Sequence, residues 1–293
     1  MIVNWLRKKM FARADKRLAL KHPPLRVPAQ SLAARFEEKL MDWFFTVMFA
    51  PLLTVLLAVL YAFAIRHGAN INLSLTVPVL LVGIVGVALV AMRIARRHRT
   101  EVQNLYLGML AERYVGQQLE RSRYLGFSVF HDITDDADGR TFNIDHIAIG
   151  EQGIFVVEAK GKSKPLKGRT EVEFDGERLS FSDGTFTDDP VRQTEANMNY
   201  VRDLLFRLLT EQRNPICEFR NAGQLPVTGM IVYPGWFVKR DGFPKKDLVV
   251  TTDKPMLRYL QRCRKILSKQ EAKELGDLLG NYLRNERRDM LLQ

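Results

Sequence analysis

The sequence predicts an α/β domain with a mixed central sheet, preceded by a hairpin of two transmembrane helices. Three observations support this prediction. Two long uncharged stretches lie within the first 95 residues, short β-rich segments alternate with helical patterns in the remainder, and basic residues gather beside the uncharged stretches. A chain of 293 residues, 46% of them hydrophobic, has room for this arrangement.

The two uncharged stretches predict the membrane hairpin. Residues 43–65 contain no charged side chain, and residues 73–94 are uncharged until Arg93. At about 1.5 Å per helical residue, each stretch reaches across a hydrocarbon core of roughly 30 Å. Pro78 is tolerated because a proline near a helix start removes no intrahelical hydrogen bond. The alternative is a buried hairpin of a soluble protein, but such proteins seldom bury two uncharged segments of this length.

The distribution of charge predicts the orientation of the hairpin. Residues 1–100 hold 15 Lys and Arg against four Asp and Glu, and Arg66 is the single Lys or Arg of the loop at residues 66–72. Segments that flank membrane helices on the cytoplasmic side are enriched in Lys and Arg. Both termini are therefore expected in the cytoplasm, with the chain in the inner cell membrane and its basic flanks against the bilayer and its anionic inner-leaflet lipids.

The formal net charge of +11 does not by itself indicate nucleic-acid binding. The remaining 29 of the 44 Lys and Arg, and the remaining 29 of the 33 Asp and Glu, fall in residues 101–293. The soluble part is formally neutral, so only local basic patches bear on nucleic acid.

Cys217 and Cys263 are too few for a disulfide framework or a cysteine zinc site, which fits a reducing compartment.

The chain is expected to divide into three parts. Residues 1–42 form a basic cytoplasmic segment, residues 43–95 hold the two transmembrane helices, and residues 100–293 form the soluble domain. The order of helical and strand patterns in the soluble domain predicts a mixed sheet. The expected elements are a helix at 106–123, strands at 128–133, 143–149 and 153–160, a peripheral hairpin at 171–186, a helix at 191–209, strands at 227–233 and 248–251, and two short helices from residue 256 onward.

Charged residues on otherwise apolar strands indicate the candidate site. Side chains alternate along a strand, so Glu158 and Lys160 are expected to point to the same face. Asp145 lies in the preceding strand, which a short turn would bring alongside. Such charges are buried at a cost that pairing, a metal ion or an open cleft usually offsets. The alternatives are that Asp145 caps a turn and that the other two residues form a surface pair.

Two carboxylates and an ammonium group suit phosphodiester chemistry. Carboxylate oxygens are the hard ligands that Mg²⁺ prefers, and a bound metal ion can activate water and offset charge on a phosphodiester. Lys160 could orient the nucleophile or stabilise the developing negative charge.

Three runs of sequence resemble a known family in their order and spacing. Gly108–Glu112, Asn143–His146 and Gly153–Lys160 look like the nuclease-related domain, a branch of the PD-(D/E)XK nuclease superfamily. Gln193, at the start of the next helix, also matches a glutamine position of that family. The resemblance covers roughly residues 105–209. It implies a restriction-endonuclease-like fold, in which helices flank a mixed central sheet, and hydrolysis of phosphodiester bonds with Mg²⁺ or Mn²⁺ as the cofactor.

The resemblance implies a role for each matching residue. Asp145 and Glu158 would bind the metal ion, with Glu112 as a further acid near the metal and a possible third ligand. Lys160 would be the catalytic lysine, and Gln193 would contact the site or a phosphate. Taken alone, Glu112 also fits an ordinary solvated helix position.

Two neighbouring features extend the candidate site. His146 follows Asp145 and is therefore expected to face away from it, in a packing or supporting position. The basic run at residues 160–169 lies directly beyond the strand and could contact phosphates. A solvated loop, or a loop that leans on anionic lipid, is the alternative for this run.

These observations favour a membrane-anchored, metal-dependent nuclease that acts on DNA or RNA from the cytoplasmic side. The main alternative is a catalytically silent nucleic-acid-binding or signalling module on the same fold. The formal neutrality of the soluble part favours this alternative, because unspecific binding of nucleic acid usually relies on many basic contacts. A structural membrane scaffold is a third possibility.

Overall fold

Two long helices come first in the structure, a computed structural model that describes residues 25–67, 73–137, 140–165, 168–211, 219, 221–239 and 247–292. Helix α2 spans Gln30–Arg66 and helix α3 spans Leu73–Glu120. Each helix contains an apolar stretch in which no residue is buried, and each is long and apolar enough to cross a membrane. The basic segment at residues 1–24, the loop at residues 68–72 and Cys217 lie outside the described residues.

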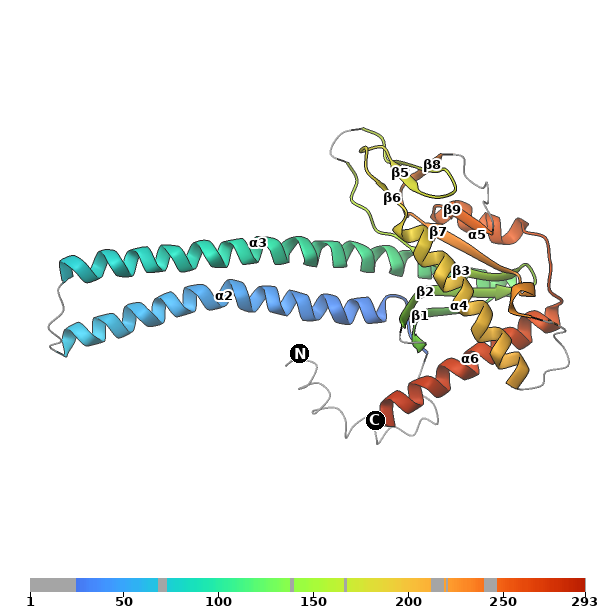
Figure 1. The fold of residues 1–293 in the computed structure, drawn as a ribbon, viewed down its shortest axis with the longest axis horizontal. Helices are drawn as coiled ribbons and strands as arrows, with labels where there is room; N and C mark the ends of the chain where they lie inside the picture. Colours follow the sequence, from blue (N-terminus) through green and yellow to red (C-terminus); the bar gives the residue numbers. More distant parts are fainter. Residues whose placement is uncertain are drawn as a thin grey trace. The chain divides into compact units, whose positions relative to one another are not determined.

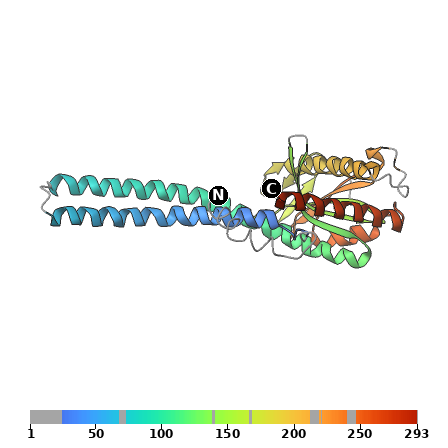
Figure 2. The ribbon, with the colours of Figure 1, turned by 90° about the horizontal axis from the view of Figure 1, so that it is seen from below.

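The two helices run side by side in both ribbon views (Figures 1 and 2). Trp43 Nε1 donates a hydrogen bond to the Ala95 carbonyl at 3.1 Å, and Lys39 Nζ lies 3.1 Å from Glu101 Oε1. The described residues between 33 and 106 belong to one compact unit, here called the helical unit. Residues 25–32 and the described residues from 107 onward belong to the second, here called the α/β unit.

Helix α3 differs from the sequence prediction. A separate helix was expected at residues 106–123, but α3 continues without a break through the basic run at residues 93–99 to Glu120. Residues 95–105 contain neither Gly nor Pro, so the basic run ends the apolar stretch without ending the helix. A short 3₁₀ helix at Arg121–Leu125 follows, and Gly126, with φ of 88°, ends it.

The α/β unit is built on a mixed sheet, as the sequence predicts. The five strands have the order β1-β2-β3-β7-β9, in which β1, β2 and β3 are antiparallel while β3, β7 and β9 are parallel. The central strand β3 therefore joins the two halves. The strands are β1 (Ser128–Ala137), β2 (Arg140–Gly150), β3 (Gly153–Ala159), β7 (Val227–Val232) and β9 (Leu248–Thr251).

A second sheet occupies the region of the expected hairpin. Its order is β6-β5-β4-β8, from β4 (Glu171–Phe174), β5 (Leu179–Phe181), β6 (Phe186–Thr187) and β8 (Phe237–Lys239). Strand β8 was not predicted. It has three residues and pairs in parallel with β4, which lies more than 60 positions earlier in the sequence, so no local pattern indicates it.

Helices cover both faces of the five-stranded sheet. Helices α4 (Asp189–Glu211) and α6 (Lys269–Leu292) bury Leu205 and Leu279 against one face. The end of α3 and helix α5 (Asp253–Arg262) bury Leu119 and Met256 against the other. Figure 1 shows this layered arrangement of the α/β unit. The last helix is longer than the short one expected, and Ser268 and Glu271 cap its start by exchanging side-chain hydrogen bonds with each other's backbone N–H.

Truncation of Leu119 is expected to destabilise the α/β unit. Its side chain is fully buried between α3 and the sheet, so Leu119→Ala leaves a cavity and should lower the free energy of unfolding by about 2–5 kcal/mol. Leu110→Ala is the matched control, because Leu110 lies in the same helix and is 43% exposed. Thermal unfolding of the two variants should separate them clearly. Equal midpoints would contradict the assigned core.

Candidate active site

The alternation of side chains breaks in strand β2 at Asp145. Ile144 and Ile147 both belong to the core under α4 and α6, although a regular strand would place residues three apart on opposite faces. The alternation of side chains breaks in the same way in the neighbouring strand β1, where Phe130 and Ile133 both belong to that core. The two breaks lie opposite each other and change the direction in which the intervening side chains point.

Asp132 and Asp145 occupy these two breaks. They fall between registered pairs of β1 and β2 and are not themselves paired. Asp132 has φ of 51°, a left-handed conformation that Asp adopts more readily than most residues. Asp145 Oδ2 accepts a hydrogen bond from the Ala159 backbone N–H of β3 at 2.8 Å. The break therefore turns the Asp145 carboxylate across the sheet toward the end of β3.

Glu158 and Lys160 lie together with Gln193 beside Asp145. Lys160 Nζ lies 2.6 Å from Glu158 Oε1 and donates a hydrogen bond to Gln193 Oε1 at 2.9 Å. Glu158 is the second-last residue of β3 and is 2% exposed, whereas Gln193 lies near the start of α4. The second carboxylate oxygen of Glu158, Oε2, is buried and has no hydrogen-bond partner.

The residue after Lys160 must be small for this geometry to exist. A Cβ atom on Gly161 would lie 2.4 Å from the backbone oxygen of Leu107 in α3. This close approach brings the end of β3 against the α3 segment that carries Glu112. Glu112 itself is 4% exposed, and its Oε1 accepts a hydrogen bond from the Ala29 backbone N–H at 2.8 Å.

Burial raises the pKa of all three predicted acids, and repulsion by neighbouring carboxylates adds to the rise in Asp145 and Glu112. Burial raises the pKa of Asp145 well above its ordinary value, and the charges of Glu158 and Glu112 add to this effect. Burial also raises the pKa of Glu158, although the ammonium group of Lys160 opposes the rise. Burial, followed by the charges of Asp132 and Glu158, raises the pKa of Glu112 to about 7. A cation bound among these carboxylates would relieve the repulsion.

The three predicted metal ligands do not form a complete three-ligand group. Among the described residues, no set of three or more His, Cys, Asp and Glu side chains is arranged to hold a metal ion. Asp145 and Glu158 remain as a pair of neighbouring carboxylates, one with a buried oxygen that lacks a partner. This arrangement still suits Mg²⁺, which is commonly bound through one or two carboxylates and completes its octahedron with water and phosphate oxygens.

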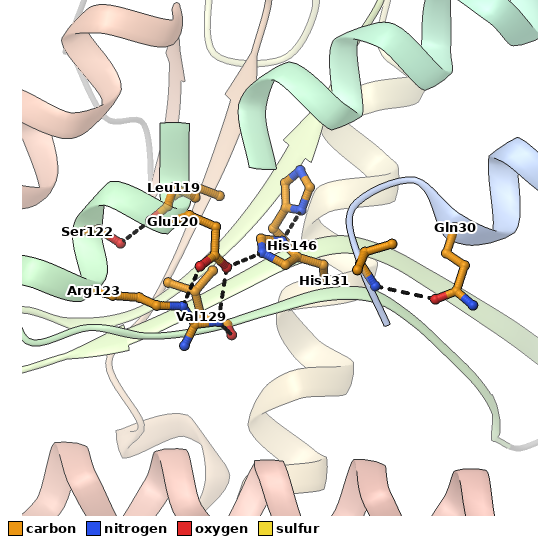
Figure 3. Close-up of polar contacts among 9 residues, drawn as sticks. Gln30, Leu119, Glu120, Ser122, Arg123, Val129, His131 and His146 are labelled. Carbon is orange, nitrogen blue, oxygen red and sulfur yellow. Dashed lines mark hydrogen bonds and ion pairs between the residues drawn. The ribbon is translucent and has the colours of Figure 1, made fainter. Parts of the chain in front are cut away.

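His146 belongs to a separate polar chain on the α3 side of the sheet (Figure 3). Its Nδ1 lies 2.9 Å from Nδ1 of His131, and His131 Nε2 lies 2.6 Å from Glu120 Oε1. Arg123 in turn donates to Glu120 and to the Val129 carbonyl. Burial lowers the pKa of both histidines, which favours neutral imidazole rings.

The basic run at residues 160–169 is partly neutralised by acidic residues. Lys162 Nζ lies 3.1 Å from Asp183 Oδ2 and 4.4 Å from the centre of the Phe181 ring. Arg169 pairs with Glu171 at 3.5 Å, and residues 166–167 lie outside the described residues. These contacts attach the run to the second sheet and leave fewer free cations for phosphate than the sequence suggests.

Sequence reasoning missed the contacts that reach the site from the N-terminal side. Ala29 contacts Glu112, and Arg26 and Ser31 contact Asp132, across 83 to 106 positions of the sequence. No motif indicated these residues, because the segment around them reads as an irregular, proline-containing link.

Comparison with known proteins identifies the region that contains the site. Residues 107–234 match the family model described as the nuclease-related domain. The matched region begins in α3 and ends just after β7, so it includes all five predicted site residues. No curated protein and no solved structure matches the chain.

Replacement of Glu112 should stabilise the chain at alkaline pH. The pKa of Glu112 is about 7 in the folded chain against an ordinary value of 4.5, so ionisation of this group costs stability as the pH rises through this range. The full difference corresponds to roughly 3 kcal/mol at most. Glu112→Gln should therefore unfold at a higher temperature than the wild type at pH 8, and the gap should close near pH 4.

The exposed Glu195 of α4 provides the control for this measurement. Thermal unfolding of Glu195→Gln should differ from the wild type by the same small amount at both pH values. A Glu112→Gln variant that is no more stable than the wild type at pH 8 would show that Glu112 ionises without cost.

Proposed function

The chain carries a nuclease-related domain over residues 107–234, and from this premise we propose that the protein is a membrane-anchored, metal-dependent nuclease. Its substrate would be DNA or RNA on the cytoplasmic side, and its reaction the hydrolysis of phosphodiester bonds. The domain is a branch of the PD-(D/E)XK superfamily, and the α/β unit has the corresponding mixed sheet flanked by helices.

The single observation that carries this proposal is the buried, unpartnered Oε2 atom of Glu158. A buried carboxylate oxygen without a hydrogen bond is destabilising, so such a group calls for a specific explanation. The neighbouring Asp145 is also buried, and its carboxylate and that of Glu158 repel each other, which adds to the cost. A Mg²⁺ or Mn²⁺ ion bound to both carboxylates would supply the missing partner and offset the repulsion.

Each residue would then have a defined task in hydrolysis. Asp145 and Glu158 would hold the ion, and Glu112 would add negative charge beside it. When bound, the ion lowers the pKa of a coordinated water and stabilises negative charge on the phosphate. Lys160 is held by Glu158 and Gln193, so its ammonium group is aimed at the same place and can donate to a phosphate oxygen or to the attacking water.

The membrane setting is part of the proposal. Helices α2 and α3 would cross the inner membrane, with both termini in the cytoplasm and the basic flanks against anionic lipid. The apolar stretches of both helices and the excess of Lys and Arg over Asp and Glu in residues 1–100 support this arrangement.

A catalytically silent module is the second candidate. The lack of a three-ligand group among the described residues supports it, as does the formal neutrality of residues 101–293. Such a module would bind nucleic acid, or respond to another signal, without cleavage. The cleavage assay below distinguishes the two candidates.

Cleavage of nucleic acid is expected to depend on Glu158 and Lys160. The full-length protein in detergent should cut labelled single- or double-stranded DNA or RNA in Mg²⁺ or Mn²⁺, and EDTA should abolish the reaction. Glu158→Gln and Lys160→Ala should each lower the cleavage rate by about 10²-fold or more, because each removes a charge from the reacting centre. Glu173→Gln and Lys273→Ala, which change exposed residues of the same kinds outside the candidate site, should retain the wild-type rate.

Two results would contradict the nuclease. Binding of nucleic acid without cleavage by a folded, metal-loaded protein would favour the silent module. Equal loss of activity in the exposed controls would show that the rates report general damage to the fold.

The topology can be tested independently of activity. A reporter that is active only in the cytoplasm, fused after Gln293, should be active, whereas the same reporter inserted at Ala69 should be silent. A reporter active only outside the cytoplasm should give the opposite pattern. An external C-terminus would refute the proposed orientation.

A further inference from the structure

A short segment outside the matched domain lies against the candidate site. It comprises residues 25–31, the last two of which begin α2, and is here called the strap. Ala29 of the strap is fully buried, and its backbone N–H donates to Glu112 Oε1 at 2.8 Å. The strap belongs to the same compact unit as residues 107–293, so this contact lies within the α/β unit.

Asp132 holds the strap in place. Its carboxylate accepts a hydrogen bond from the Ser31 backbone N–H at 3.0 Å and a second from the Ser31 hydroxyl, and it pairs with Arg26 Nη1 at 3.1 Å. The same guanidinium group also donates to the Asp132 carbonyl at 3.3 Å. Asp132 is 2% exposed, so these contacts satisfy a carboxylate that has little access to water.

The strap is also fitted sterically to helix α3. A Cβ atom on Gly116 would lie 2.5 Å from Cγ of Pro28, so the ring of Pro28 rests directly on the helix backbone. Ala29 has φ of 57°, a conformation that non-glycine residues seldom adopt. Strained residues of this kind persist where the surrounding contacts determine them and are common at functional sites.

We propose that the strap is a positioning element for the metal site and that Asp132 is the residue that positions it. This inference rests on the proposed function. The strap places hydrogen-bond donors at two buried carboxylates, Asp132 and Glu112, that repel each other. Because Glu112 Oε1 accepts the hydrogen bond from the Ala29 N–H, the Glu112 carboxylate is held in one orientation beside Asp145 and Glu158. Groups that orient the acids of a metal site commonly change metal affinity by 10-fold to 100-fold when they are removed.

The test compares strap variants of the full-length protein in detergent. The double variant Arg26→Ala/Ser31→Ala removes the side-chain anchors, and Arg26→Lys/Ser31→Thr retains a cation and a hydroxyl. Val27→Ala is the matched control, because Val27 lies in the strap and is 62% exposed. The readout is the affinity for Mn²⁺, measured from the metal-dependent rise in unfolding temperature, with kcat and KM for cleavage measured in parallel.

The proposal predicts at least tenfold weaker Mn²⁺ binding in the alanine double variant, with most of the affinity restored in the Lys/Thr variant and none lost in Val27→Ala. A purely structural strap would lower the unfolding temperature of the metal-free protein and leave the Mn²⁺ affinity unchanged. That second result would overturn the inference while leaving the nuclease proposal intact.

A double-mutant cycle with Glu112→Gln shows whether the strap acts through Glu112. In the Glu112→Gln background, removal of the Arg26 and Ser31 side chains should cause no further loss of Mn²⁺ affinity, because the positioned acid is already gone. An additional tenfold loss in this background would overturn the inference. Absence of Mn²⁺ binding by the wild-type protein would instead overturn the proposed function, and the positioning role with it.

Discussion

The burial of four carboxylates within a small part of the α/β unit is the constraint on which the site depends. Glu112, Asp132, Asp145 and Glu158 are each less than a tenth exposed. Buried carboxylates repel each other and need donors or cations, so each must be matched by a specific partner. The partners come from different elements: Lys160 follows β3, the Ala159 N–H belongs to β3, and the strap supplies Ala29, Ser31 and Arg26.

The candidate site lies at the end of β3, the central strand that joins the antiparallel and parallel halves of the sheet. This strand pairs antiparallel with β2 on one side and parallel with β7 on the other. Pairing with β2 ends at Val157, whereas pairing with β7 continues to Ala159. On the β2 side the Ala159 N–H bonds instead to the Asp145 carboxylate, and the Lys160 backbone N–H bonds to the Val232 carbonyl beyond the strand. A rigid strand end is a good support for the proposed catalytic groups, because such side chains need to be held within a fraction of an ångström.

The buried acids of the candidate site lower the stability of the folded chain. The raised pKa of Glu112, Asp145 and Glu158 means that the folded chain disfavours their ionised forms, so these groups lower stability at neutral and alkaline pH. Well-packed apolar residues would make a more stable core at the same positions. The two apolar cores on either side of the sheet offset this cost, and on the α3 side the chain of Glu120, His131 and His146 pairs both ring nitrogens of His131.

The sequence by itself determined the features that depend on local periodicity. The two uncharged stretches gave two long apolar helices, and the mixed sheet followed from the order of strands and helices. The period of two along a strand placed Glu158 and Lys160 together, and the short turn after β2 brought Asp145 beside them. The prediction of separate helices at residues 73–94 and 106–123 was wrong, because α3 is continuous. A cluster of arginines ends an apolar stretch but does not interrupt a helix.

Only the tertiary structure decided how the buried carboxylates are satisfied. Asp132 sits in an ordinary strand pattern, and the strap reads as an irregular link, so neither carries a local signal. Their contacts join residues 83 to 106 positions apart and form only when the chain has folded. The break that aims Asp132 and Asp145 away from the regular alternation is likewise shared by two strands. Periodicity in a sequence records which face a residue occupies, whereas the partner it meets there is set by packing between distant segments.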